Sequence, residues 1–108
     1  MESHLFMEAA LNGDAAKVKE ALDGGMNPNI ADNDMRTPLM LAAYNGHVPV
    51  LGMLLDAGAE INRRDRQGRT ALMFASTGPF PAAVKMLIDH GAEVNVVDGG
   101  EGWTPLMF

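Results

Sequence analysis

Apolar side chains recur along this chain at helical spacings, and polar segments rich in glycine and asparagine separate them. In the middle of the chain the pattern predicts two short helices. Their apolar positions are Leu39, Ala42 and Ala43, then Leu51, Leu54 and Leu55. Thr37 before Pro38 marks a helix start, because threonine caps free N–H groups and proline fits the first turn. We predict helices over about 38–44 and 48–57, followed by a left-handed Gly58.

One sequence motif occurs three times in the chain. The phrase at 36–40, Arg-Thr-Pro-Leu-Met, returns at 69–73 and at 103–107 with small changes. The first two copies are 33 residues apart and the third follows after 34, with an extra glycine near 99–100. Such a period indicates stacked units of supersecondary structure rather than one closed globule.

Glycine, asparagine and aspartate keep the same register in each unit. The aligned positions are Gly25, Gly58 and Gly91, then Asn29, Asn62 and Asn95, then Asp32, Asp65 and Asp98. This recurrence indicates repeated backbone geometry. We interpret the polar segment after each second helix as an extended finger or hairpin that projects from the stack.

Composition narrows the class of protein. The chain has 108 residues, no cysteine and a formal net charge of −6, so it offers no disulfide or thiol chemistry, and its charge disfavours nucleic acid or an anionic membrane as partner. No secretory signal is apparent at the start. The longest nearly apolar run, 48–55, is shorter than the roughly 20 residues of a spanning helix. We expect a cytoplasmic protein.

The sequence contains few residues in patterns that are typical of catalytic or metal sites. Ser76 lacks the flanking glycine of a nucleophile elbow, and no carboxylate pair recurs at a spacing suited to acid–base work. The three histidines, His4, His47 and His90, occupy three different positions of the unit. The glycine-rich stretch 99–102 lacks the Lys-Ser/Thr ending of a phosphate loop. We therefore predict no enzyme, no cofactor and no metal.

The repeated residues resemble ankyrin repeats. The resemblance rests on Asp32, on 36–43 with its Thr-Pro-Leu phrase, on Gly46-His47, and on 54–62. It implies an all-α solenoid of stacked helix-turn-helix units, with β-hairpin fingers at right angles to the helices. The implied division of the chain is 1–31 as an N-terminal capping repeat, 32–64 as repeat 2, 65–97 as repeat 3 and 98–108 as a truncated repeat 4.

Two departures from the family pattern stand out. Methionine replaces the family's histidine in every unit, at positions 7, 40, 73 and 107. A thioether cannot donate the imidazole's hydrogen bonds, so we expect the stack to depend more on apolar contact. The other methionines are also expected in the core, except Met35. In repeat 3, 78–81 (Gly-Pro-Phe-Pro) replaces Asn-Gly-His and predicts a rebuilt, stiffer corner.

Most of the basic residues fall in the predicted fingers. Five of the eight are Arg36, Arg63, Arg64, Arg66 and Arg69. One interpretation is local pairing with Asp32, Asp34, Asp65 and Glu60. The other is a binding ridge, because the resemblance implies that the fingertips and the exposed side of the first helix hold the partner. The positions so implied are Asn33, Asp34, Met35, Arg36, Tyr44, Asn45, Arg64, Arg66, Gln67, Arg69, Thr77, Glu101 and Trp103.

The function predicted from these features is a protein–protein interaction module with a regulatory or scaffolding role, whose partner carries an acidic or mixed patch. An alternative is an architectural fragment of a longer array that forms homo-oligomers through an uncapped C-terminal face, with Leu106, Met107 and Phe108. A third hypothesis, a nucleic-acid binder, is disfavoured by the net charge.

Overall fold

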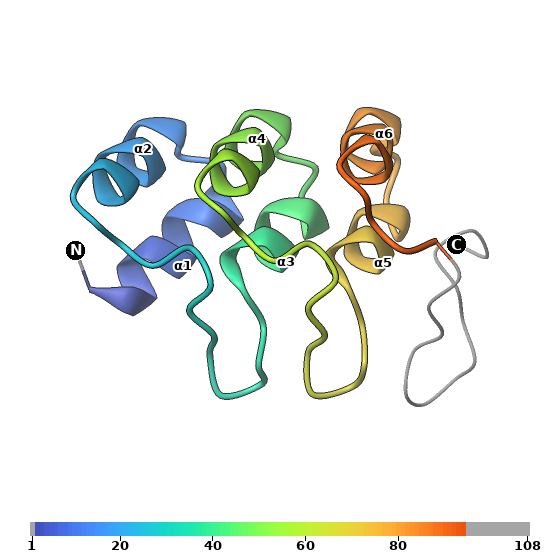
Figure 1. The fold of residues 1–108 in the computed structure, drawn as a ribbon, viewed down its shortest axis with the longest axis horizontal. Helices are drawn as coiled ribbons and strands as arrows, with labels where there is room; N and C mark the ends of the chain where they lie inside the picture. The colour runs from blue at the N-terminus through green and yellow to red at the C-terminus, as the bar shows by residue number, and fades with distance from the viewer. Residues whose placement is uncertain (1, 95–108) are drawn as a thin grey trace.

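The computed structural model describes residues 2–94, which contain six α-helices in three pairs (Figure 1). The helices are α1 (Ser3–Asn12), α2 (Ala15–Asp23), α3 (Pro38–Tyr44), α4 (Val48–Asp56), α5 (Ala71–Ser76) and α6 (Pro81–Asp89). The predicted repeat 4 at 98–108, with Glu101, Trp103 and the proposed self-association residues, lies outside the described residues.

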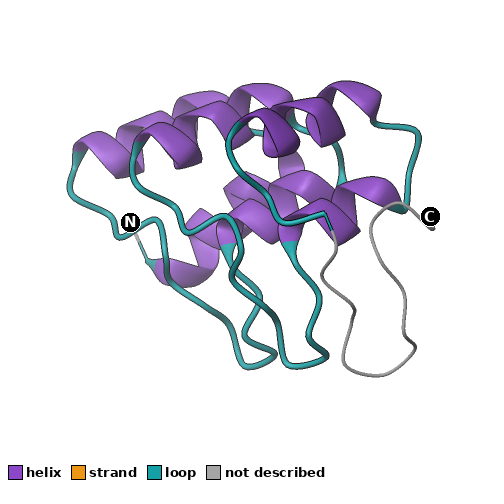
Figure 2. Cartoon of the chain, turned by 45° about the vertical axis from the view of Figure 1, so that its right-hand side comes forward, coloured by secondary structure: helices purple, strands orange, loops and turns teal. Residues whose placement is uncertain are grey.

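The helices form two layers. The first helices of the pairs lie side by side, with α3 between α1 and α5 and in contact with both. The second helices form the other row, in which α4 contacts α2 and α6. Two long loops extend away from both layers on the side of α1, α3 and α5 (Figure 2). We call residues 29–37 finger 1 and residues 62–70 finger 2.

Threonine caps start α3 and α5, as the sequence predicts. The hydroxyls of Thr37 and Thr70 accept hydrogen bonds from the backbone N–H groups of Met40 and Met73, at 3.4 Å each. The Met40 sulfur in turn accepts a hydrogen bond from the Thr37 N–H at 3.4 Å. The methionine that replaces the family's histidine therefore completes the cap as an acceptor, although it cannot donate.

The predicted helix ends are also confirmed. Helix α4 ends at Asp56, one residue before the predicted boundary. Gly58 adopts the left-handed conformation with φ +97°, and the equivalent glycines at 25 and 91 have φ +95°. A residue with a Cβ is strained in this region, which explains why glycine recurs there.

The core lies between the two layers and continues through all three pairs. Its largest fully buried side chains include Phe6, Leu39, Leu51, Leu54, Leu72 and Leu87. Alanines at 42, 43 and 75 are fully buried where α3 approaches its neighbours, because small side chains let the helices come close. Burying each leucine contributes about 1.5–3 kcal/mol. Met40 and Met73 are 1% exposed and Met35 is 49% exposed, as predicted, whereas Met26, Met53 and Met86 are only partly buried against the core.

In repeats 2 and 3 an aromatic ring packs on the corner glycine of the preceding repeat. The His47 ring lies against Gly13, and the Phe80 ring lies against Gly46. The His47 ring nitrogen Nε2 is also 2.9 Å from the carbonyl oxygen of Leu11. Phe80 lies 33 residues after His47, so the rebuilt corner of repeat 3 replaces a polar ring by an apolar one.

Turns, rather than strands, close the fingers in residues 2–94. In finger 1 the Asp32 N–H donates to the Arg36 carbonyl at 3.0 Å, and in finger 2 the Asp65 N–H donates to the Arg69 carbonyl at 2.9 Å. These backbone hydrogen bonds bring the two arms of each finger together. The helical repeat architecture is observed, but the predicted β-hairpin strands are not confirmed in this part of the chain.

Candidate functional site

Finger 1 is organised by the carboxylate of Asp32. One oxygen, Oδ1, accepts hydrogen bonds from the backbone N–H groups of Asp34 and Arg36, at 2.9 Å each. The other, Oδ2, accepts from the Arg36 guanidinium Nε at 2.9 Å. Burial raises the pKa of Asp32, but the hydrogen bonds from Arg36 and Asp34, together with the charge of Arg36, outweigh it and leave the pKa lowered.

Finger 2 repeats this arrangement around a more deeply buried carboxylate. Asp65 Oδ1 accepts from the N–H groups of Gln67 at 3.0 Å and Arg69 at 2.8 Å. Asp65 Oδ2 accepts from Arg69 Nε at 3.0 Å, and the Asp65 side chain is only 2% exposed. The aspartate carboxylate of each finger thus accepts hydrogen bonds from the backbone N–H groups of the turn, and the tip of the finger remains available to other molecules.

The two fingers are braced against each other. The Arg66 N–H donates to the Asp34 carbonyl at 2.8 Å, and the Arg66 guanidinium donates to the Asn33 carbonyl through Nη2 at 2.6 Å and Nε at 3.2 Å. Nearer the helices, Arg63 Nη1 donates to the Asn29 carbonyl at 2.9 Å. Finger 2 is therefore held in a defined position beside finger 1.

Beside the base of finger 2, two aromatic rings and an arginine form a cluster. The Arg69 guanidinium carbon is 4.9 Å from the centre of the Phe74 ring. The Tyr44 ring meets the same Phe74 ring edge-on, with centroids 6.2 Å apart and planes at 82°. Tyr44 is 52% exposed, so α3 presents an aromatic surface beside the Phe74 ring that Arg69 contacts.

The structure places most of the predicted partner-binding residues on the surface. Those exposed are Asn33, Asp34, Met35, Tyr44, Asn45, Arg64, Arg66, Gln67 and Thr77, and Arg36 and Arg69 are half-buried. Glu101 and Trp103 lie outside the described residues. The fingers bring Arg66 to Asn33 and Asp34, while Tyr44 and Arg69 both contact Phe74.

Several of these side chains already have structural partners. Asn45 Nδ2 donates to the Leu11 carbonyl at 2.8 Å, and Thr77 Oγ1 donates to the Phe74 carbonyl at 2.7 Å. The interpretation of the arginines as locally paired is confirmed for Arg36, Arg63 and Arg69, which form ion pairs within their own segments. The surface is thus less basic than the arginine count suggests.

Phe74 is not among the site residues predicted from the sequence. Its side chain is buried, with 8% exposed. A comparison of the repeats could have identified Phe74, because the equivalent residue one repeat earlier is Leu41. An aromatic residue five positions after an arginine, in one repeat only, marks the cation–π contact.

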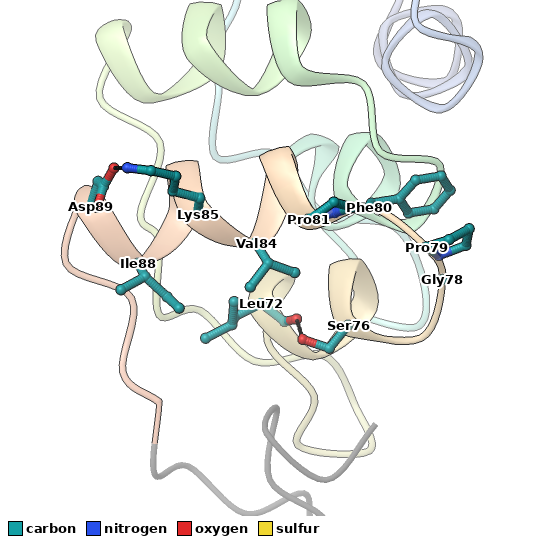
Figure 3. Close-up of a pocket in the computed structure, with 10 residues that line it drawn as sticks. All are labelled: Leu72, Ser76, Gly78, Pro79, Phe80, Pro81, Val84, Lys85, Ile88 and Asp89. Carbon is teal, nitrogen blue, oxygen red and sulfur yellow. Dashed lines mark hydrogen bonds and ion pairs between the residues drawn. The ribbon is translucent and has the colours of Figure 1, made fainter.

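The end of repeat 3 carries a second feature, an open hollow of about 530 Å³ between α5 and α6 (Figure 3). Its apolar wall includes Leu72, Val84 and Ile88, and Ile88 is 40% exposed. Lys85 and Asp89 form an ion pair of 2.9 Å at its edge. The hollow therefore combines an apolar wall with a charged edge.

Neither a metal site nor a spanning helix is found in residues 2–94. No group of three or more potential ligands among His, Asp and Glu gathers in this part of the chain. The helices there are also too short or too polar to cross a membrane.

Comparison with known proteins agrees with the geometry of the fold. A family model described as ankyrin repeats (3 copies) matches residues 6–98, which is most of the chain. The search of curated proteins found no match. The matched segment includes most of α1, the other five helices, the threonine caps of α3 and α5, and both fingers. This chain therefore belongs to the ankyrin repeat family.

Proposed function

We propose that this chain is a protein–protein interaction module with a regulatory or scaffolding role in the cytoplasm. Ankyrin repeats in general bind other proteins and are not enzymes. In this proposal the helix pairs form a solenoid, and a partner protein contacts the fingertips and the exposed side of the first-layer helices α3 and α5. The observation that carries the proposal is the brace between the fingers, which orients the exposed polar side chains of the fingertips before any partner binds.

Pre-orientation favours binding because ordering a flexible loop costs free energy on association, at about 0.5–1.5 kcal/mol for each immobilised long side chain. The Arg66 bonds to Asn33 and Asp34 and the carboxylates of Asp32 and Asp65 remove much of that cost. Exposed tyrosine and arginine are also residue types that carry interface energy.

Charge favours an acidic surface on the partner. Finger 2 contains four arginines and one aspartate, a formal charge of +3, whereas finger 1 contains two aspartates and one arginine, a formal charge of −1. The chain as a whole is acidic at −6, so finger 2 is a local basic region on an acidic protein. A partner with an acidic patch would be steered toward finger 2 and kept away from the rest of the surface.

Site-specific photocrosslinking tests this placement. A photoreactive amino acid replaces Asn33 or Gln67 at the fingertips, and matched control variants carry it at the exposed residues Glu20 and Asp56 of α2 and α4. We expect a protein partner to crosslink from the fingertip positions and not from the controls. Crosslinking from the α2 and α4 positions alone would refute the proposed surface.

The hollow at the end of repeat 3 favours a second candidate function, self-association in a larger assembly. An exposed Ile88 beside an apolar wall is the kind of surface that another copy of the chain could cover. Light scattering across a concentration series tests this candidate. A mass that rises with concentration and returns to the monomer value in Ile88→Glu supports it, and a monomer at every concentration eliminates it.

A further inference from the structure

Two arginines at equivalent positions of the fingers differ in what neutralises them. Arg36 and Arg69 are 33 residues apart, and each donates through Nε to the aspartate at the base of its finger. In finger 1 a second carboxylate, that of Asp34, lies 3.4 Å from Arg36 Nη2. In finger 2 the position equivalent to Asp34 is Gln67, which carries no charge. Arg36 is therefore paired twice and Arg69 once.

The neighbouring ring also differs between the two repeats. The guanidinium of Arg69 lies over the Phe74 ring, whereas the residue equivalent to Phe74 in repeat 2 is Leu41. The Nε bond to Asp65 and the ring contact hold the guanidinium at two points. Within residues 2–94 its terminal nitrogens Nη1 and Nη2 form no hydrogen bond, and the side chain is 38% exposed. A cation held in this way loses little entropy when it binds an anion.

The other arginines of finger 2 are poorer candidates for binding an anion. Arg64 is exposed, and within residues 2–94 its guanidinium forms no hydrogen bond or ion pair that would hold it in place. The Arg66 guanidinium is occupied by the Asn33 carbonyl, and Arg63 is divided between the Asn29 carbonyl and Glu60. The Phe74 ring that Arg69 contacts also meets the exposed Tyr44 ring edge-on, so an aromatic surface continues from the guanidinium toward α3. A guanidinium on such a surface suits a carboxylate that has an apolar neighbour.

We propose that Arg69, held by Asp65 and by the Phe74 ring that Tyr44 also contacts, binds a carboxylate from an acidic peptide segment of the partner protein. Arg36 is neutralised by its own finger and does not take part. The inference rests on the proposed function and deepens it, because it assigns the recognition of acidic character to one residue. Arginine suits this role, since its two terminal N–H groups match the two oxygens of a carboxylate.

A titration of the intact chain with two synthetic peptides tests the proposal. The probe is a five-residue capped peptide with one central phenylalanine flanked by two glutamates on each side, and the control peptide carries glutamine in place of glutamate. The readout is the NMR resonance of the Nε–H group of each arginine. We expect the Arg69 resonance to shift and saturate with the acidic peptide only.

Charge-matched variants separate a specific site from general attraction. Arg69→Met and Arg36→Met each remove one positive charge. We expect Arg69→Met to weaken peptide binding at least tenfold and Arg36→Met to leave it within twofold. Thermal melting of both variants checks folding, and Arg69→Lys, which keeps the charge but loses the planar fork, should fall between wild type and Arg69→Met. Equal losses in the two methionine variants would overturn the proposal.

A second pair of variants tests the reason for the difference. Gln67→Asp gives finger 2 the second carboxylate of finger 1, so it should neutralise Arg69 and weaken binding several-fold without removing the arginine. Asn33→Asp adds the same charge at the tip of finger 1 and should have a smaller effect. Unchanged binding in Gln67→Asp, equal effects of the two aspartates, or equal binding of the glutamine peptide would each overturn the assignment.

The failure of this inference can be told apart from failure of the proposed function. If a protein partner crosslinks from Asn33 and Gln67 but its affinity is unaffected by Arg69→Met, the proposed interaction surface is supported and the carboxylate site is refuted. If crosslinking occurs only from α2 and α4, both proposals are refuted. Stronger saturable binding of a single-stranded DNA oligonucleotide than of the acidic peptide would overturn the choice of a protein partner.

Discussion

Replacing Gly46 by alanine tests how repeats 2 and 3 are joined at the corner between α3 and α4. A Cβ at Gly46 would lie 2.4–2.9 Å from three atoms of the Phe80 ring, which is closer than packed atoms approach. Gly58 is a matched control, because a Cβ there would meet nothing within 4 Å. Both glycines have positive φ, +68° at Gly46 and +97° at Gly58, so both alanine variants carry backbone strain.

The expected magnitudes follow from these two contributions. Holding alanine in the left-handed region costs about 1–2 kcal/mol, and Gly58→Ala should lose about that much. Gly46→Ala should lose a further 1–3 kcal/mol or so, because the Phe80 ring must leave its packed position. The strain at Gly58 is no smaller than at Gly46, since its φ is further from the left-handed minimum. The comparison therefore tends to underestimate the packing contribution.

Urea unfolding followed by helical circular dichroism measures both free energies of unfolding. We expect Gly46→Ala to be the less stable variant and a Phe80→Leu substitution to cost less in the Gly46→Ala background than in the wild type. Losses that agree within about 0.5 kcal/mol would refute the reasoning, because independent surface substitutions fall within that range. The Phe80 ring would then not be packed on Gly46 in solution.

Three further predictions concern stability. Gly52→Ala should raise the free energy of unfolding by about 0.5–1 kcal/mol, because Gly52 lies inside α4, where glycine is less favourable than alanine. The added Cβ would meet only the Met86 methyl, at an ordinary contact distance of 3.8 Å, and chemical denaturation checks the prediction. Thr70→Ala should lower it by about 1 kcal/mol through loss of the α5 cap, with Thr70→Ser as control. Asp32 has a lowered pKa, so its contribution to stability is present above its ordinary pKa of 3.8 and is lost as the pH falls through the lower folded value. Asp32→Asn should therefore destabilise finger 1 at pH 7 and reduce the loss of stability on acidification, which melting temperatures between pH 7 and pH 2 would show.

Most of the local structure could be predicted from the sequence. The Thr37-Pro38 start, the end of α3 and the left-handed Gly58 depend on interactions within a few residues, and each signal is repeated in the neighbouring unit. Apolar spacing likewise predicted which side chains are buried. The Met40 sulfur was correctly expected in the core, but its role as acceptor of the Thr37 N–H was missed, because it depends on the rotamer that packing selects.

The candidate site could be predicted only in outline. The sequence pointed to the fingers and to Tyr44, and these residues are indeed exposed. It did not distinguish among the arginines, because their pairing depends on residues up to 34 positions away, as in the Arg63 bond to Asn29. Phe74 was overlooked for the same reason, since its contact with Tyr44 joins two different repeats.

The sequence by itself determined the repeat, its helices, the positions of its caps and turns, and the family, because these follow from short-range backbone preferences and from the spacing of apolar side chains. Only the tertiary structure decided which charges are already neutralised. An electrostatic interaction depends on distance in space, and the preceding finger brings backbone carbonyls to Arg63 and Arg66, whereas Arg69 receives none. The chain thus encodes several arginines in finger 2, and the stacking of the repeats leaves Arg69 as the one we propose for recognition.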